Sequence, residues 1–538
     1  MFSAVEKAYL SNAKEGKYSR YISEQFLWGS GARRPLRTNP NQPEPTRTNP
    51  NQPEPPSNQV PELTPLPLVV DLDGTLTATD TLAESVIRII RRNPADLLRL
   101  PFWLAAGRAA FKARIAERAD FQADSIPYRE TLLCYLEAER KQGRTIILAT
   151  AAHHSIAERV SAHLGVFDAV IATEQNINLK GAAKLASIRA CVGEHFVYAG
   201  DSKADLPIWA AAQGAIVVGA SPGVAAAARK AVYVEREFPP EQADFATWCR
   251  ALRVHQCLKN LLLFVPLLTA FAFFDMDRIA TLALAFVSFS LGASATYIAN
   301  DFWDLDSDRR HPRKRNRPFA SGALSLAQGA SCAAVLLMLA FVLAFAVSTR
   351  FAAMLVLYLA FTTAYSLWFK SIVLLDVIVL SLLYTLRIVA GAVAVDISVS
   401  HWLLAFSVLT FLSLALVKRC SELVLLRQND KRVSAGRDYR VGDLEVLWPF
   451  GIGAALAAVV VFGLFINAPE TAERYAVPHL LWLVQIGLIY LFGRLWVSTV
   501  RGAMHDDPIV HLLENRGSVG TLFLMVAIVL AAHFLPVL

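Results

Sequence analysis

Residues 300–322, NDFWDLDSDRRHPRKRNRPFASG, lie between two long apolar runs and carry four aspartates followed by six lysines and arginines. Three of these aspartates, Asp301, Asp304 and Asp308, are spaced so that on a helix they share one face, whereas Asp306 points elsewhere. Carboxylates gathered in one cavity repel unless cations lie between them, and their hard oxygen atoms suit Mg²⁺, which bridges phosphate oxygens. The basic residues that follow can bind the same phosphates. A solvated loop beside a membrane would explain the basic residues but not the spaced aspartates, so the stretch predicts a site for a magnesium-bound diphosphate.

The surrounding sequence predicts a membrane domain. The chain has 538 residues, of which 54% are hydrophobic and 18% charged, and a mean hydropathy of +0.39, which is too apolar for an ordinary soluble protein. The predicted all-α domain has nine transmembrane helices, at about residues 259–275, 278–299, 325–347, 351–369, 372–394, 401–417, 446–467, 477–497 and 518–538.

The distribution of charge predicts how this domain is oriented. The loops after the second and sixth apolar segments hold most of the basic residues, which places both loops in the cytoplasm. They also explain the net charge of +7 without a nucleic acid partner. We therefore expect a multi-pass protein of the cell inner membrane, whose contact partner is the lipid bilayer.

The N-terminal half is organised differently. Residues 37–55 contain RTNPNQPEP twice in tandem, which predicts a disordered tether. The chain start has no apolar core typical of a signal peptide, so the soluble part should be cytoplasmic. The six cysteines of the whole chain follow no metal-binding or disulfide pattern and indicate reduced thiols. The predicted organisation is a disordered region at 1–62, an α/β domain at 63–240 and the membrane domain at 250–538.

The α/β domain is predicted from short apolar runs, PLPLVV, TIILAT, HFVYAG and AIVVGA, that alternate with helical segments. Asp71 follows the run that ends at Val70, so it should lie at the carboxyl end of a strand, where such sheets bind ligands. A carboxylate there can be a nucleophile, and Asp73, two residues on, can act as general acid and base. An ordinary turn after a strand would also explain DLDGT taken alone.

Three further motifs occur in the expected order: Thr150 at the end of a second strand, Lys184 in LKGAAKLASI, and Asp201 with Asp205 in VYAGDSKADLPIW. Together with DLDGT they resemble the haloacid dehalogenase superfamily of phosphatases over about residues 65–235. The resemblance implies a Rossmann-like fold with a small helical cap at about 80–127. It also implies Asp71 as nucleophile, Asp73 as general acid/base, phosphoryl binding by Thr150 and Lys184, and a Mg²⁺ site of Asp71, Asp73, Asp201 and Asp205. A degenerate domain kept for docking is the alternative.

The stretch at 300–322 closely resembles the first aspartate-rich motif of the UbiA superfamily of intramembrane prenyltransferases, whose members have nine transmembrane helices. The resemblance covers about 253–538 and implies Asp301, Asp304 and Asp308 as catalytic Mg²⁺ ligands. Arg387 is a site candidate in its own right, because it lies near the middle of an apolar run. The implied substrate-binding residues are Lys259, Asn260, Asn300, Lys314, Arg317, Tyr365, Lys370 and Arg387.

One departure from the UbiA pattern indicates which branch of the superfamily the chain resembles. The loop after the sixth segment lacks a second DxxxD motif, because Asp438 and Asp443 have the wrong spacing. Its KRCSEL and GRDY instead resemble the branch that contains decaprenyl-phosphate phosphoribosyltransferase. This implies that 5-phosphoribose is transferred from phosphoribosyl pyrophosphate to a polyprenyl phosphate, for cell-envelope glycans. The predicted additional substrate-binding residues are Lys418, Arg419, Arg437 and Tyr439.

The two domains together suggest a bifunctional enzyme in which the haloacid dehalogenase-like domain removes the 5-phosphate from the lipid-linked product. Its substrates would be a polyprenyl lipid and a phosphorylated sugar diphosphate, and its cofactor Mg²⁺. Two alternatives stay open. One is transfer of a polyprenyl group from its diphosphate to an aromatic acceptor, with an unrelated or non-catalytic soluble domain, and the other is a membrane scaffold that binds without turnover.

Overall fold

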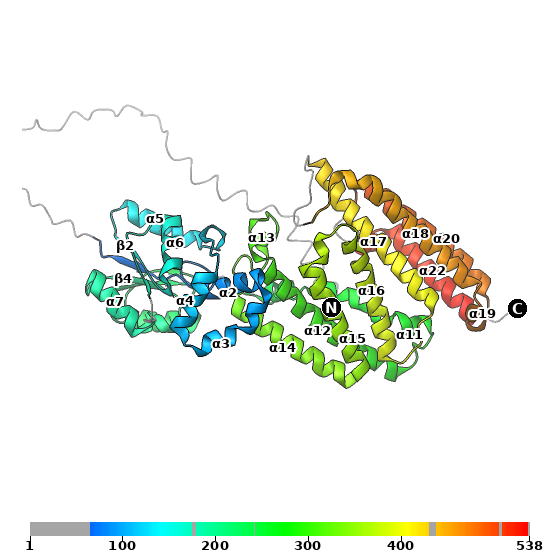
Figure 1. Cartoon of the computed structure of the whole chain (residues 1–538), viewed down its shortest axis with the longest axis horizontal. Coiled ribbons are helices and arrows are strands. Elements are labelled where there is room, and N and C mark those ends of the chain that lie inside the picture. The colour runs from blue at the N-terminus through cyan, green and yellow to red at the C-terminus, as the bar shows by residue number, and fades with distance from the viewer. Residues whose placement is uncertain (1–64, 175–178, 241–242, 430–436, 505–507, 536–538) are drawn as a thin grey trace, which may run out of the picture. The chain divides into compact units, whose positions relative to one another are not determined.

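A computed structural model describes residues 65–174, 179–240, 243–429, 437–504 and 508–535 (Figure 1). The predicted disordered tether at 1–62 lies outside these residues. The first described part is built around a six-stranded parallel sheet with the order β3-β2-β1-β4-β5-β6. The strands are β1 Leu68–Val70, β2 Ile146–His153, β3 Ala169–Thr173, β4 Val197–Gly200, β5 Gly214–Val218 and β6 Val234–Phe238.

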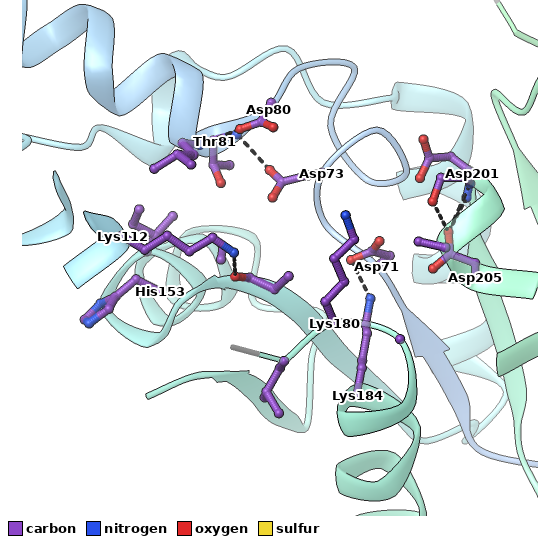
Figure 2. Close-up of a pocket in the computed structure, with 18 residues that line it drawn as sticks. Asp71, Asp73, Asp80, Thr81, Lys112, His153, Lys180, Lys184, Asp201 and Asp205 are labelled. Atoms are coloured by element: carbon purple, nitrogen blue, oxygen red, sulfur yellow. Dashed lines mark hydrogen bonds and ion pairs between the residues drawn. The ribbon is translucent and has the colours of Figure 1, made fainter. Parts of the chain in front are cut away.

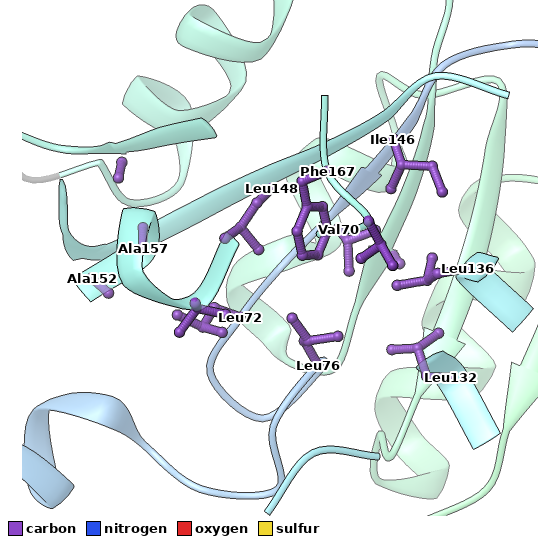
Figure 3. Packing of buried hydrophobic residues seen from close by; sticks show 14 of the residues in the cluster. Val70, Leu72, Leu76, Leu132, Leu136, Ile146, Leu148, Ala152, Ala157 and Phe167 are labelled. Atoms are coloured by element: carbon purple, nitrogen blue, oxygen red, sulfur yellow. The ribbon is translucent and has the colours of Figure 1, made fainter. Parts of the chain in front are cut away.

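Helices cover both faces of this sheet, which explains why its strands are continuous apolar runs. They are α5 Glu130–Lys141, α6 His154–Leu164, α7 Ala182–Val192, α8 Leu206–Trp209 and α9 Pro222–Ala231, with the short η3 Lys203–Asp205. Val70 and Leu148 pack with α5 and α6 on one face (Figure 3). Val69 and Ile147 pack with α7, α8 and α9 on the other.

The strand order fixes where a ligand can bind. From β1 the chain moves outward in one direction through β2 and β3, and then returns to the other side of β1 to form β4, β5 and β6. The direction therefore reverses between β1 and β4, and open α/β sheets bind ligands outside the carboxyl ends of the strands at such a point. Asp71 and Asp201 are the first residues after these two strands.

Residues 80–127, between β1 and α5, are mostly helical. They form α2 Thr81–Arg92, η1 Pro94–Leu98, α3 Leu100–Ala105, α4 Arg108–Arg118 and η2 Ala123–Ser125. Asp80 caps α2 by accepting the N–H groups of Leu82 and Ala83. Ile89, Trp103 and Ile115 form a small core of their own that joins α2, α3 and α4.

The rest of the described chain is helical. Its α-helices are α10 Phe245–Ala251, α11 Val265–Thr269, α12 Met276–Trp303, α13 Leu305–Arg310, α14 Leu326–Val347, α15 Thr349–Leu367, α16 Leu375–Ala394, α17 His401–Gln428, α18 Leu444–Ile466, α19 Pro469–Arg474, α20 Leu481–Val500, α21 Pro508–Glu514 and α22 Arg516–Phe534. Short 3₁₀ segments connect them: η4 Val254–Phe264, η5 Lys314–Asn316, η6 Phe369–Ser371, η7 Val441–Asp443 and η8 Pro478–Leu480.

Eight of the described helices are long and apolar enough to cross a membrane, and a ninth span arises if a bent pair counts as one. The pair is Phe245–Ala251 with Val254–Thr269, bent by 53°. The predicted first span at 259–275 is therefore not one regular α-helix. Its first part belongs to the 3₁₀ segment η4, which is followed by the short α11. Two residues explain it: Arg253 has φ 51°, which ends the preceding helix, and Pro266 lies in the first turn of α11.

Candidate functional sites

The nucleophile position predicted at Asp71 lies at the carboxyl end of β1. The turn after it brings the chain back on itself, since the N–H of Thr77 donates to the Leu72 carbonyl over 3.0 Å. Lys184 Nζ lies 2.8 Å from Asp71 Oδ1 and its side chain is buried (Figure 2). An ammonium group there neutralises the carboxylate and could also bind a phosphoryl oxygen beside it.

Three carboxylates converge at the end of the sheet. One oxygen each from Asp71, Asp201 and Asp205 lies within 4.8 Å of the others, and hard oxygen atoms in this arrangement fit Mg²⁺. The side chain of Asp73 stands apart from these three, because its Oδ1 accepts the Thr81 N–H over 2.7 Å. The geometry thus assigns the four predicted ligands to two different places: three at the carboxylate cluster and one at the start of the cap.

The protonation of these groups is set by burial. Burial, together with the neighbouring Asp80 charge, raises the pKa of Asp73 to about 7. Burial also raises the pKa of Asp71, although the Lys184 ammonium opposes this. A carboxyl group with a pKa near neutrality can both donate and accept a proton, which suits the general acid/base role predicted for Asp73.

These side chains line a cavity of about 300 Å³. Cap residues reach into it: Asp80, Thr81 and Lys112 lie on the side of the cavity facing Asp73 (Figure 2). Lys180 lines the cavity as well, and Lys112 Nζ donates to the Ala151 carbonyl over 2.7 Å. The sequence reasoning missed these two lysines, because nothing in their local pattern distinguishes them from residues of a solvated basic face.

Thr150 differs from its prediction in one respect. Strand β2 continues to His153, so Thr150 lies within the strand and not at its end. The extension arises where the pairing with β3 shifts register between Ala149 and His153. The Thr150 side chain is fully buried, and its hydroxyl accepts the Ala152 N–H over 3.0 Å. Ala151, Ala152 and His153, rather than Thr150, line the cavity.

The aspartate-rich stretch forms a second site. The three aspartates do not lie on one uninterrupted helix as predicted, because α12 ends at Trp303 and α13 begins at Leu305, with Asp304 between them. They are nevertheless held by nearby cations. Arg317 Nη1 lies 3.3 Å from Asp301 Oδ1 and 2.6 Å from Asp308 Oδ2. Arg253 also pairs with Asp301, and Lys370 Nζ lies 2.9 Å from Asp304.

Two oxygen atoms of this second site have no partner in the described part of the chain. Asn300 Oδ1 and Asp308 Oδ1 are buried and have no hydrogen-bond partner among the described residues. A buried oxygen without a partner is costly, and a Mg²⁺ ion would satisfy both the charge and the oxygens. The oxygen donors present thus suit Mg²⁺, but Asp301, Asp304 and Asp308 are each paired with an arginine or lysine and do not converge as Asp71, Asp201 and Asp205 do. Lys314, also predicted here, is exposed on η5 and acts on Asp308 through its charge.

The buried Arg387 of α16 anchors a polar cluster inside the helices. Its Nε donates to Asn260 Oδ1 over 3.0 Å and its Nη2 to the Tyr358 hydroxyl over 3.0 Å. The predicted pair Asn260 and Arg387 is thus brought together by η4 and α16. Lys259, the neighbour of Asn260, places its ammonium 5.8 Å from the centre of the Tyr384 ring.

A third polar cluster joins α16, α17 and the segment after residue 436. Arg419 Nη2 lies 2.8 Å from Asp376 Oδ2, and both side chains are buried. The Tyr439 hydroxyl also donates to Asp376. Arg437 pairs with Glu422 over 3.2 Å. Of the remaining predicted residues, Tyr365 is a half-buried residue of α15 that interacts electrostatically with Arg437. Lys418 is half-buried on α17.

The sequence reasoning missed three residues of the membrane sites. Asp376 was visible as a lone acid in an apolar run, which is a recognised signal of function. Glu422 lies inside KRCSEL, and Arg253 is the first residue of the stretch at 253–260, RVHQCLKN, which also holds Lys259 and Asn260. Arg253 and Glu422 can be assigned only from the structure. The partner of Arg253, Asp301, is remote in sequence, and the partner of Glu422, Arg437, lies across a loop.

Comparison with known proteins agrees with both parts of the chain. Residues 261–497 match the UbiA prenyltransferase family, and residues 68–209 match the haloacid dehalogenase-like hydrolases. The uncharacterized protein y4nM of Sinorhizobium fredii is 39% identical over 456 residues, 84% of this chain and 88% of that protein. A match of this extent covers both domains, so the fusion itself occurs in a relative.

Two other relatives match the C-terminal part. The nodulation protein NoeC of Azorhizobium caulinodans is 38% identical over 274 residues, which is 51% of this chain and 89% of that protein. The decaprenyl-phosphate phosphoribosyltransferase of Corynebacterium glutamicum is 29% identical over 309 residues, which is 56% of this chain and 91% of that protein. With its apolar helices and its two sites, the chain belongs to the UbiA prenyltransferase family of multi-pass membrane proteins and carries a haloacid dehalogenase-like domain before the membrane helices.

Proposed function

We propose that the membrane domain transfers 5-phosphoribose from phosphoribosyl pyrophosphate to a polyprenyl phosphate, and that the haloacid dehalogenase-like domain then removes the 5-phosphate from the lipid-linked product. The product would serve as a lipid-linked pentose donor for cell-envelope glycans. The N-terminal domain would face the cytoplasm, the side on which phosphoribosyl pyrophosphate is available, and the membrane would be the cell inner membrane.

In the transfer step, an oxygen of the polyprenyl phosphate bonds to C1 of the phosphoribose while the bond from C1 to the diphosphate breaks. The diphosphate leaves with the electron pair of that bond. Asp301, Asp304 and Asp308 would hold Mg²⁺, which supplies charge neutralisation for the leaving diphosphate when bound. Arg317 and Lys370 already lie against these carboxylates and would bind the remaining phosphate oxygens.

In the hydrolytic step, the Asp71 carboxylate would attack the phosphorus of the 5-phosphate, and Asp73 would give its proton to the leaving sugar oxygen. Asp73 would then take a proton from the water that hydrolyses the aspartyl phosphate, releasing inorganic phosphate. Asp71, Asp201 and Asp205 would hold Mg²⁺, and Lys184 would bind a phosphoryl oxygen.

The observation that supports the proposal is that the described part of the membrane domain has one loop in which three aspartates, Asp301, Asp304 and Asp308, lie against basic side chains, and no equivalent set in the second loop. In the second loop the Asp443 carboxylate is used to cap η7, accepting the Arg440 N–H over 2.8 Å. A single magnesium-bound diphosphate needs one acidic loop, and the guanidinium groups of Arg419 and Arg437 suit further phosphate groups. The relative in Corynebacterium glutamicum bears the name of this transfer reaction.

The first test supplies membranes that contain the protein with labelled phosphoribosyl pyrophosphate and a polyprenyl phosphate. We expect a labelled lipid without the 5-phosphate from the wild type, and a labelled lipid that keeps it from Asp71→Asn. Loss of the nucleophile should lower the dephosphorylation rate by at least about 10³-fold. Unchanged dephosphorylation in Asp71→Asn would contradict the assignment of the hydrolytic site.

The second test addresses the transferase site. Asp301→Ala should abolish formation of the labelled lipid, because it removes a metal ligand and leaves Arg253 and Arg317 without their shared partner. The soluble-domain activity, measured on a small phosphate ester, serves as the folding control. Activity of the wild type on a prenyl diphosphate and an aromatic acid, with no labelled lipid from phosphoribosyl pyrophosphate, would replace the proposed donor with the alternative one.

A further inference from the structure

Residues of the short helix α13 contact two different parts of the chain. Asp308 belongs to the transferase site through Arg317. The neighbouring Asp306 and Arg309 instead contact α2, the first helix of the cap that follows the hydrolase loop. The charged stretch at 300–322 therefore divides its residues between two domains, and the aspartate that did not fit the metal-binding pattern has a partner elsewhere.

The contact between α13 and α2 is a buried ion-pair network. The two terminal nitrogens of the Arg309 guanidinium, Nη2 and Nη1, donate to the Glu84 carboxylate over 2.6 Å and 3.0 Å. Glu84 is fully buried and Arg309 is 7% exposed. Asp306 binds Arg88 at 3.0 Å and Arg91 at 3.1 Å. Removing one partner from such a network leaves an uncompensated charge in the interior, which is strongly destabilising for that arrangement.

Arg309 also links this network to the transferase loop. Its Nε donates to the Ala320 carbonyl over 3.1 Å, and Ala320 lies three residues after Arg317. Arg309 thus connects its own segment, which carries Asp308, to the segment that carries Arg317. Apolar packing supports the same contact, because Ala83 and Ile87 of α2 pack against a buried cluster that includes Leu305 and Phe319.

We infer that α2 of the hydrolase cap positions the acidic loop of the transferase site, with Glu84 and Arg88 as positioning residues for a reaction that takes place in the other domain. The soluble domain is then a structural part of the transferase as well as a separate catalyst. The inference rests on the proposed function only for the choice of donor, since any magnesium-bound diphosphate would use the same loop.

The test is Glu84→Gln, which keeps the shape of the side chain but removes the charge that Arg309 requires. We expect the transfer rate at low donor concentration to fall about 10-fold or more, the size of effect typical for groups that orient metal ligands. The change should appear as a higher KM for phosphoribosyl pyrophosphate and a higher half-saturating Mg²⁺ concentration, with the KM for polyprenyl phosphate unchanged. Arg92→Gln, at an exposed position of the same helix, is the matched control and should match the wild type.

A binding measurement makes the result independent of the donor. Titration calorimetry with magnesium pyrophosphate, in an Asp71→Asn/Asp201→Asn background that disables the hydrolase metal site, should show weaker binding for Glu84→Gln and for the milder Asp306→Asn. Equal pyrophosphate affinity in all variants would overturn the inference. A wild type that binds pyrophosphate but transfers no phosphoribose would refute the proposed function and leave this inference standing.

Discussion

At the scale of single residues, Gly74 shows how closely the hydrolase site is packed. Its φ of +81° is a conformation that side-chain-bearing residues rarely adopt, and a Cβ added there would overlap the Asp201 carboxylate. The glycine therefore serves two needs: it allows the turn after Asp71, and it lets the β1 loop approach the β4 loop closely enough to bring their carboxylates together.

The two needs can be separated by experiment. Gly74→Ala should abolish phosphatase activity and weaken Mg²⁺ binding, because the new methyl group displaces Asp201. Gly143→Ala is the matched control, since Gly143 has a φ of +82° but nothing within 4 Å of the added Cβ. It should cost roughly 1–2 kcal/mol of stability from backbone strain alone and leave activity intact. Equal losses of activity in both variants, measured on a small phosphate ester, would mean that strain and not overlap is responsible.

Most residues of the candidate hydrolase site could be predicted from the sequence, because they lie at or near strand ends. Asp71, Lys184, Asp201 and Asp205 follow or face strand ends, so their convergence follows from the strand order. Lys112 was not predictable, because it reaches the cavity from the cap, whose packing on the sheet depends on tertiary contacts. In the membrane domain the same limit applies to Arg253, whose partner Asp301 is remote in sequence.

At the scale of elements, the contact between η4 and α16 positions the buried Arg387. Gly391 lies one turn after Arg387 on α16, and a Cβ there would overlap the carbonyl of Leu263 on η4. Only a glycine lets the two elements approach this closely. The approach in turn sets the 3.0 Å hydrogen bond between Arg387 and Asn260.

Gly391→Ala should therefore separate η4 from α16 and misplace Asn260 relative to Arg387. We expect the transfer activity to fall about 10- to 100-fold, in line with the effect of misplacing a binding group by about 1 Å. Gly453→Ala on α18 is the matched control, because it lies in a helix and an added Cβ meets nothing within 4 Å. Lipid transfer assayed in the same membranes checks both, and similar activity in the two variants would show that the close approach is not required.

Hydropathy predicted most membrane helices because burial in lipid demands long apolar runs whatever their partners. It failed at the first span, where the bent pair and η4 replace a regular helix. That irregularity follows from the Arg253 conformation and from Pro266 in the first turn of α11, neither of which appears as a gain or loss of apolar residues. Helix α13 was missed for a similar reason, as the charge pattern does not reveal the break at Asp304.

At the scale of the whole molecule, the sequence predicted two catalytic domains on one chain, and the relative y4nM covers both. If the proposed reactions take place, a shared chain would keep the lipid-linked product near the second site and so raise its effective concentration. The sequence could not predict that the domains also share a buried ion-pair network, because Glu84 and Arg309 carry ordinary helix-surface patterns and lie 225 positions apart.

The apolar packing of Ala83 and Ile87 against the buried cluster that includes Leu305 and Phe319 limits how far the hydrolase domain can be exchanged. A hydrolase domain taken from another fusion would not simply substitute for this one, because it would bring a different α2 to an unchanged α13. Successful exchange would require moving residues 305–320 together with the cap. Changes in the two segments should likewise accumulate in pairs as the lineage diverges, so the junction would be inherited as a unit even though the two candidate sites use different residues.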